Sequence, residues 1–584
     1  MSDAMINKPP SSPIKAPLQQ GSVEVIENAE NGVNQQSSNE EKGEVSSNEA
    51  HHAPKLTDIR FIMVLVGFGM AFIGSQIQPL LFAALIPLIA ADLDAHPLIV
   101  WFFSTQLVAV GVIAPFIGPL ADLFGRKPIT IIGVFSSLLG MIVCAATPNA
   151  AGYIAGQALT GIGLAAQELM AITAIVEIVP TRYRGYYVAI IVASFLPFAP
   201  GSLYGTLIAE TSWRYCACFI AIWNLITVVL VFLFYNPPPR TNSAGLTWQQ
   251  KLKHIDFIGG FLMSGGLVMF LVGFNWGGQL YPWHSARVIS FLTIGLAMLV
   301  FFFFYEWLLA PYPMFPRRLM RHPRTFMALM VVIAMAGINY IPVLFFWVMQ
   351  AVGVYNSDFK MLGIRTLPFG FCILGGALIA ALVVSAFKGH LRTIMSFFCI
   401  MQCAAIGSLV AVDVHNINTV WAPLCLGLLG VGGVLIPNQI IITVICPDDL
   451  IATATCLTVC LRAVGQVVGV SIFYTQFVSV LTARTLKIVI PVALQSGIGD
   501  LDTLQNMMPD LLAEAYSQWV LSVPALDTPE KISNLHEAVI TAFGGAFARV
   551  YYISIAFGGT AVIASFFIEN LNNLMDHHIA VHYF

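Results

Sequence analysis

The sequence predicts an all-α membrane protein that crosses the bilayer many times. Hydrophobic residues make up 58% of the 584-residue chain and charged residues only 10%, whereas soluble proteins carry roughly 25% charged residues. The mean hydropathy is +0.81, and apolar runs of about 20 residues, enough to cross the hydrocarbon of a bilayer, recur along the chain. The net charge of −3 argues against a nucleic-acid-binding protein, which usually has a basic domain.

Fourteen apolar runs qualify as spans. Each is expected to be a helix, because a backbone in lipid must satisfy its own hydrogen bonds. The predicted spans cover residues 61–90, 98–120, 128–147, 150–178, 186–208, 214–235, 256–276, 288–309, 327–350, 366–387, 393–412, 419–443, 451–479 and 546–568. Residues 1–57 are rich in Ser, Asn, Gln and Glu and bury too little apolar area to fold, so they are predicted to be a disordered cytoplasmic tail.

The distribution of Lys and Arg predicts the topology, because these residues concentrate in cytoplasmic loops. With the N-terminal tail inside, fifteen of them fall in short inner segments and four in short outer loops: Arg214, Arg287, Lys360 and Arg365. Both termini, including a tail over residues 569–584, are therefore expected in the cytoplasm. Residues 480–545 become a long outer loop with an amphipathic helix near Leu501–Val520. We expect a plasma-membrane protein, with the vacuolar membrane as the alternative.

The chain contains an internal repeat. Three pairs of landmarks recur at offsets of 264 to 269 residues: Gly125–Pro128 with Gly389–Arg392, Pro180–Gly185 with Pro447–Ala452, and Gly161–Gly163 with Gly430–Gly432. The repeat predicts a six-helix bundle over 58–236, a segment 237–325 with linkers and two inserted helices, and a second six-helix bundle over 326–568. Internal symmetry of this kind is typical of transporters whose substrate site lies near the midplane between the repeats.

The strongest local motif follows the second span. It reads Gly118-Pro-Leu-Ala-Asp122-Leu-Phe-Gly125-Arg126-Lys127 and resembles the loop signature of the major facilitator superfamily. The resemblance implies the major facilitator fold, with Asp122 and Arg126 stabilising the outward-facing state. Conformational gating is therefore expected to involve the motif residues together with an acid of the fourth span, Glu177, which we expect to pair with Arg126. Pairing of Glu177 with Arg182 or Arg184 is the alternative.

The helix count resembles the fourteen-helix drug:proton antiporter branch. Four stretches are similar to the fungal trichothecene efflux pump family: Gln167–Leu169, Pro197–Pro200, Trp213–Tyr215 and Trp276–Trp283. The resemblance implies proton-coupled export. Two positions depart from the branch, since Gln78 stands where an acid is usual and Gln157 where an arginine is usual.

Glu168, in the fourth span, is the predicted proton-coupling residue. A charge at the bilayer centre costs about 2.5–3.5 kcal/mol on insertion scales, so an ionisable group there suggests function. Desolvation favours the neutral carboxyl, which would let Glu168 exchange a proton. Helical geometry places Gln157, Gly161 and Leu164 on the same face, which we interpret as lining a cavity. Further polar groups predicted to line it are Gln76, Gln78, Gln106, Gln167, Asn339, Asn438, Gln439 and Arg462.

Arg462 is the one basic residue deep in a predicted span. It is expected either to contact the first bundle or to bind an anionic substrate, and the first interpretation is favoured. No phosphate-binding loop, nucleophile elbow or zinc-protease motif is present. The ten cysteines lack metal-site spacing, so no enzyme activity, metal or cofactor is expected.

The predicted function is secondary active export of an amphipathic small molecule, a toxin or drug, by proton-coupled alternating access. The alternatives are siderophore–iron uptake by proton symport and a non-transporting receptor or scaffold. The expected partners are the small-molecule substrate, protons and the lipid bilayer, with no nucleic acid, and the protein is expected to be a monomer.

Overall fold

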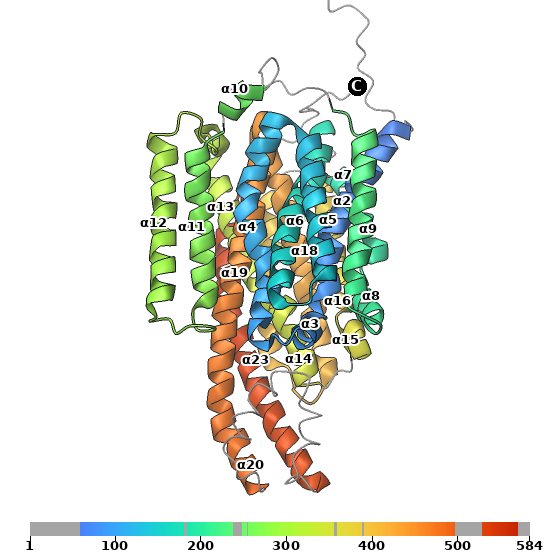
Figure 1. Ribbon diagram of the computed structural model, residues 1–584, viewed down its shortest axis with the longest axis vertical. Helices are drawn as coiled ribbons and strands as arrows, with labels where there is room; N and C mark the ends of the chain where they lie inside the picture. Colours follow the sequence, from blue (N-terminus) through green and yellow to red (C-terminus); the bar gives the residue numbers. More distant parts are fainter. Residues whose placement is uncertain are drawn as a thin grey trace, which may run out of the picture. The chain divides into compact units, whose positions relative to one another are not determined.

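The computed structural model describes residues 59–179, 184–237, 248–253, 255–355, 359–387, 390–496 and 528–569. Over these residues the structure is helical, and fourteen helices are long and apolar enough to cross a membrane (Figure 1). The predicted fold class and span count are thereby confirmed. The predicted tail over 1–57, the predicted helix near Leu501–Val520 and the residues after 569 lie outside the described residues.

The first six spans form the N-half. They are α2 (Ile59–Ala83), α4 (Ile99–Phe124), α5 (Arg126–Ala146), α6 (Ala150–Ile178), a broken span made of α7 (Arg184–Ala193) and α8 (Gly201–Ala209), and α9 (Arg214–Phe234). The fifth span breaks because Pro197 and Pro200 lack the N–H groups that a continuous helix needs, and a short 3-10 turn, Leu196–Phe198, occupies the gap. A further short helix, α3 (Ile86–Asp92), follows α2.

The last six spans form the C-half, and two inserted helices precede it. The inserted pair is α11 (Phe257–Trp276) and α12 (Ala286–Leu308). The C-half contains α13 (Pro323–Ile341) with α14 (Trp347–Gly353), α16 (Leu367–Ala386), α17 (Leu391–Ser408), α18 (Trp421–Ile445), α19 (Ile451–Arg484) and α23 (Pro529–Ser565). A π-helical turn, Pro342–Phe346, joins α13 to α14. Short helices α10 (Trp248–Lys253), α15 (Phe359–Arg365) and α20 (Ile490–Gln495) complete the described elements named here.

The two halves repeat one packing pattern. In the N-half, α6 packs against α4 and α5, and in the C-half α18 packs against α16 and α17. The halves meet along two seams that are also equivalent: α4 packs on α19, and α7 with α8 packs on α16. The second helix of each half thus contacts the fifth helix of the other. A cavity between the halves is therefore bounded by corresponding helices from both.

The inserted pair lies beside the seam between α4 and α19 (Figure 1). Asn275 of α11 donates its amide to the Ser104 hydroxyl of α4 at 2.5 Å, and Ser471 of α19 donates to the Asn275 carbonyl at 3.5 Å. Asn275 is fully buried, so its polar atoms need these partners. One side chain of the insertion therefore joins both halves.

The connection predicted over residues 480–545 contains more helix than expected in the part that the structure describes. α19 continues to Arg484, a π-helical turn and α20 extend the helix to Gln495, and α23 begins at Pro529 instead of residue 546. At 1.5 Å per residue, the 37-residue α23 is roughly 55 Å long, well beyond about 30 Å of hydrocarbon. The helices extend past the other spans (Figure 1) and bury apolar side chains in this extension, among them Leu481, Val489 and Leu535.

This extension makes a stability prediction. Leu535 is fully buried in the extension, so Leu535→Ala is expected to cost about 2–5 kcal/mol by analogy with other buried leucine truncations and to lower the thermal midpoint of the purified protein in detergent. Tyr552→Ala, on the same helix but 60% exposed, is the matched control and should change the midpoint little. Equal shifts for the two variants would show that the paired extension is not a packed element.

Candidate functional site

The turn between α4 and α5 sets one end of the molecule, which we call the motif end. α4 ends at Phe124, α5 begins at Arg126, and Gly125 alone connects them. Gly125 has a φ of +94°, a conformation that favours glycine because residues with a Cβ are strained there. The glycine thus allows the direct helix reversal that brings Arg126 back beside Asp122.

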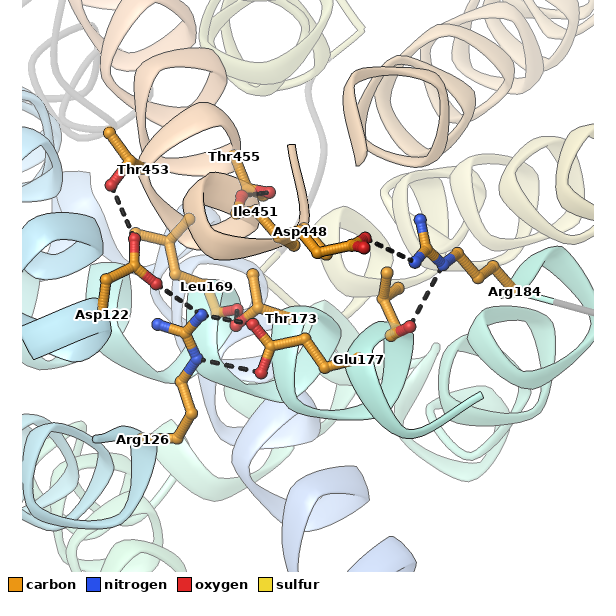
Figure 2. Close-up of polar contacts among 11 residues, drawn as sticks. Asp122, Arg126, Leu169, Thr173, Glu177, Arg184, Asp448, Ile451, Thr453 and Thr455 are labelled. Carbon is orange, nitrogen blue, oxygen red and sulfur yellow. Dashed lines mark hydrogen bonds and ion pairs between the residues drawn. The ribbon is translucent and has the colours of Figure 1, made fainter. Parts of the chain in front are cut away.

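A buried charge network occupies the motif end. Arg126 Nη2 lies 2.7 Å from Asp122 Oδ1, and its Nε donates to Glu177 Oε2 at 3.3 Å while Nη2 also contacts Glu177 Oε1 (Figure 2). The expected pair between Glu177 and Arg126 is therefore present. All three side chains are buried, so each charge depends on its partners, because an unpaired charge away from water is costly.

The network reaches across the seam between the halves through Asp122. The Thr453 hydroxyl of α19 donates to Asp122 Oδ2 at 2.7 Å, as Figure 2 shows. Thr453 lies in the first turn of α19, where the positive end of the helix dipole favours a carboxylate. Asp122 is thus held by a cation from its own half and by a helix start from the other half.

Arg184 makes a second crossing. It lies at the start of α7, and its Nη1 donates to the Thr443 carbonyl of α18 at 2.8 Å, while its Nε donates to Val176 O at 3.1 Å. Its Nη2 lies 3.9 Å from Asp448 Oδ1, just before α19 (Figure 2). Arg184 is 2% exposed, so its guanidinium is shielded from solvent, whereas the Asp448 side chain is 41% exposed.

Two glycines bring the helices close enough for these crossings. A Cβ on Gly118 of α4 would lie 2.7 Å from the Ala452 carbonyl oxygen of α19, and a Cβ on Gly185 of α7 would lie 2.7 Å from the Ala381 carbonyl oxygen of α16. Both distances are shorter than real Cβ contacts. The two seams are therefore closed at the motif end by a glycine each.

An internal cavity of about 170 Å³ lies between the halves, beyond the charge network. It is lined by α2, α4 and α6 of the N-half and by α13, α16, α18 and α19 of the C-half, with many aromatic side chains. Sites for drug-sized ligands usually have about 300 Å³ or more, so the cavity is smaller in this structure than a typical site of that kind.

An ion pair forms part of the cavity wall and joins the halves. The distance between Oε2 of Glu168 on α6 and Nη2 of Arg462 on α19 is 2.6 Å. The amide of Gln439 on α18 donates to the other carboxylate oxygen, Glu168 Oε1, at 3.2 Å. The Glu168 side chain is 4% exposed and that of Arg462 14%. Both side chains line the cavity, and the guanidinium is the more exposed of the two.

The structure brings part of the predicted cavity set together. Gln76, Gln106, Gln157, Glu168 and Arg462 line the cavity. Of the face predicted for α6, Leu164 also lines it, whereas Gly161 packs against the Gln106 backbone of α4. Gln439 lies behind the wall, on Glu168.

Four predicted cavity residues lie elsewhere. Gln167 is one residue before Glu168, about 100° around the helix, and its amide donates to Asn224 of α9. Asn438 donates to the Leu329 backbone of α13. Gln78 and Asn339 are buried but do not line the cavity. These amides belong to helix packing, and sequence position within a span could not separate the two environments.

Lys127 also differs from the rest of its motif. Its ammonium donates to the Phe232 carbonyl at 2.8 Å and to Asn236 Oδ1 at 2.6 Å, both within the N-half. It therefore ties α5 to α9 and makes no crossing to the C-half among these contacts.

Sequence reasoning missed several site residues. Arg184 was named only as an alternative partner of Glu177, and Thr453 was not singled out. Each lies in or next to a repeat landmark, Pro180–Gly185 or Pro447–Ala452, which was the signal that could have found them. Tyr153, Tyr340 and Gln466 also line the cavity, and the pairing of Glu168 with Arg462 was not foreseen because the two residues are 294 positions apart.

The opposite end of the N-half carries a second polar cluster, the far-end cluster of Asp92, Trp213, Arg214 and the Thr147 carbonyl. Trp213 Nε1 and Arg214 Nη1 both donate to Asp92 Oδ2 at 2.9 Å, and Arg214 Nη2 donates to Thr147 O at 3.2 Å. The indole hydrogen bond and the guanidinium hold the pKa of Asp92 below its ordinary value, against an opposing effect of burial.

The comparison with protein families identifies the chain. The description of the fungal trichothecene efflux pump family matches residues 28–584. The chain belongs to this family. Relatives in the same superfamily include the MFS-type transporter ucsD of Acremonium sp, 28% identical over 431 residues, 71% of this chain and 70% of the relative. The MFS-type transporter TwmF of Talaromyces wortmannii is 23% identical over 529 residues, which are 89% of this chain and 92% of the relative.

A solved structure shows the same fold. A bacterial homologue of the human lysosomal transporter Spinster, in an inward-facing and unoccupied conformation, aligns with a TM-score of 0.52 and 11% identity, over 88% of this chain and 98% of the homologue. The family and the fold together make the chain a multi-pass membrane transporter of small molecules of the major facilitator superfamily.

The close contact of Gly118 with α19 predicts that a larger residue at this position opens the motif end of the transporter. Gly118→Ala places a methyl group against the α19 backbone, so the halves must separate at the motif end, at an overpacking cost of about 1–3 kcal/mol. Thiol labelling of a cysteine introduced at Thr453 should increase from the motif side. Gly375→Ala on α16, where a Cβ would meet nothing within 4 Å, is the matched control and should leave labelling unchanged. Unchanged labelling in Gly118→Ala would refute a tight seam.

The far-end cluster predicts an acid dependence. Because the pKa of Asp92 is lower in the folded protein, its stabilisation is present above the ordinary carboxyl value of about 4 and is lost as the pH falls below it. The difference in thermal midpoint between wild type and Asp92→Asn should therefore be constant above about pH 5 and shrink toward pH 3. A difference that grows as the pH falls would contradict the assignment.

Proposed function

We propose that this transporter exports an amphipathic small molecule in exchange for protons, with Glu168 as the proton carrier. The observation that carries the proposal is the ion pair between Glu168 of the N-half and Arg462 of the C-half in the cavity wall. Protonation of Glu168 removes the carboxylate charge and leaves Arg462 without its partner. A proton therefore alters an interaction that holds the two halves together.

The energy available to such a switch is substantial. Breaking a buried ion pair by removing one charge typically costs about 3–5 kcal/mol, and a population shift from 1:99 to 99:1 needs about 5.5 kcal/mol. Protonation of one buried carboxylate thus supplies much of what a change between two conformations needs. Export requires that the proton be taken up on one side and released on the other, which the alternation of the cavity provides.

The motif end supplies the gate. Asp122 and Arg184 link the halves there, while Arg126 and Glu177 hold Asp122 in place. The excess of Lys and Arg in the segments on this side supports a cytoplasmic location for the motif end. In this arrangement the cytoplasmic side is closed, the state in which an exporter has moved its cavity away from the cytoplasm. A plasma-membrane location follows for a pump that removes toxins from the cell.

Proton coupling is tested with Glu168→Gln. In proteoliposomes carrying a radiolabelled trichothecene, a pH gradient should drive uptake by the wild type against the toxin gradient. Glu168→Gln should lose this response while still exchanging labelled for unlabelled toxin, because the amide cannot cycle a proton. The measurement is toxin flux as a function of the imposed pH gradient.

Two controls separate coupling from folding. Glu210→Gln removes an exposed carboxylate and should leave coupling intact. The double variant Glu168→Gln with Arg462→Gln leaves no unpaired buried charge and should restore thermal stability but not proton-driven flux. Retention of full gradient-driven flux by Glu168→Gln would refute the proton assignment, and accumulation of a labelled ferric siderophore by expressing cells would favour uptake over export.

A further inference from the structure

We propose that the cavity contains a recognition subsite formed by Tyr153, Gln157 and Gln106, and that this subsite binds the oxygen acceptors of an uncharged substrate. Trp213, which is held by Asp92, positions Tyr153 in the subsite. The inference rests on the proposed function in taking this cavity as the transport site. It assigns recognition to residues other than those that carry the proton.

The cavity has two regions of different polarity. Glu168 and Arg462 are the charged residues among those that line it, and they pair with each other. Neither is therefore left to neutralise a charged substrate while the pair is intact, and an unpaired charge would be costly in this setting. The other region contains Tyr153, Gln157 and Gln106, which are all neutral. These residues lie nearer the ends of α4 and α6 that are farther from the motif end.

The neutral region offers hydrogen-bond donors without partners. Gln106 Nε2 is buried and has no partner among the described residues. Tyr153 is fully buried, its hydroxyl adjoins the Gln157 amide, and it makes no well-formed hydrogen bond among the residues that the structure describes. A buried donor left unpaired costs about 1–3 kcal/mol, so an arriving acceptor oxygen has a gain to make. Carbonyl, ester and epoxide oxygens meet this need without adding a charge.

The aromatic surroundings complete the subsite. Phe102, whose ring centroid lies 4.7 Å from that of Tyr153, and Phe103 also line the cavity. Apolar walls with a few polar groups are typical of sites that fix the orientation of a small ligand. The subsite is therefore suited to a polycyclic or aromatic skeleton that carries a few oxygen atoms.

The far-end cluster holds the Tyr153 ring in place. The Trp213 ring packs edge-on against it at 5.7 Å, on a side other than the cavity lining, since Trp213 does not line the cavity. The Trp213 indole is itself fixed by its hydrogen bond to Asp92, and Arg214 lies 4.5 Å over the indole ring. This gives a role to Trp213 and Arg214, which the transport mechanism leaves unexplained. Trp213 is a positioning residue, because it acts through Tyr153.

The experiment measures binding to the full-length protein in detergent at fixed pH. Radiolabelled progesterone, an uncharged tetracycle with two ketone oxygens, is displaced by unlabelled progesterone, by the oxygen-free hydrocarbon pregnane, and by a carboxylated derivative of the same skeleton. Wild type should bind progesterone saturably and at least tenfold more tightly than either competitor. Absence of saturable binding, or equal affinity for all three, would overturn the proposal.

The variants assign the preference to the subsite. Tyr153→Phe and Gln106→Leu should each weaken progesterone binding about three- to tenfold without changing the affinity for pregnane. Trp213→Phe and Asp92→Asn should likewise reduce the ratio of the progesterone affinity to the pregnane affinity, which we call the selectivity ratio. Tyr215→Phe removes a hydroxyl from a 56% exposed side chain and is the control with no change. A merely structural role of Trp213 would lower the affinity for both probes together and would overturn its positioning role.

This measurement stands apart from the test of proton coupling. Binding at one pH needs no gradient, so loss of the selectivity ratio in Tyr153→Phe counts against the subsite alone when Glu168→Gln behaves as an uncoupled exchanger. Conversely, a Glu168→Gln variant with normal gradient-driven flux counts against the proton carrier and leaves the binding result unaffected.

Discussion

A charge placed between helices in a bilayer must find a partner, and this requirement governs how the two halves of the molecule meet. Asp122 and Glu168 belong to the N-half, and each accepts a hydrogen bond from the C-half, from Thr453 and Arg462 respectively. The halves are therefore joined by polar contacts set in apolar surroundings, in addition to the packing of α4 on α19 and of α7 on α16. Under the proposed function, these polar contacts are the ones that would break and re-form as the protein changes conformation.

The two polar layers have different chemical character. At the motif end Asp122 accepts a hydrogen bond from the start of α19, but its negative charge is already compensated within its own half by Arg126. In the cavity wall, Glu168 depends on residues of the opposite half, Arg462 and Gln439, for the contacts described here. The two layers therefore differ in how much of the compensation for each carboxylate comes from the opposite half. Under the proposed function, this difference would separate the gate from the coupling site.

Sequence alone was sufficient for what depends on local pattern. Apolar run length gave fourteen spans, glycine and charge spacing gave the turn at Gly125, and helical periodicity put Leu164 and Glu168 on one face. It was insufficient where partners come from distant segments: no spacing rule pairs residue 168 with residue 462, and an amide such as Gln167 looks the same whether it faces a cavity or a neighbouring helix. The last two helices run beyond their predicted spans because residues too polar to cross a bilayer can still form a helix, which outside hydrocarbon needs only one apolar face.

The insertion has a mechanical consequence. Asn275 bonds to both halves along the seam between α4 and α19, and no corresponding inserted pair accompanies the seam between α7 and α16 in the described part of the chain. Any displacement of α19 relative to α4 would therefore also change the hydrogen bonding of Asn275. The inserted pair is thus coupled to the relative position of the two halves along this seam.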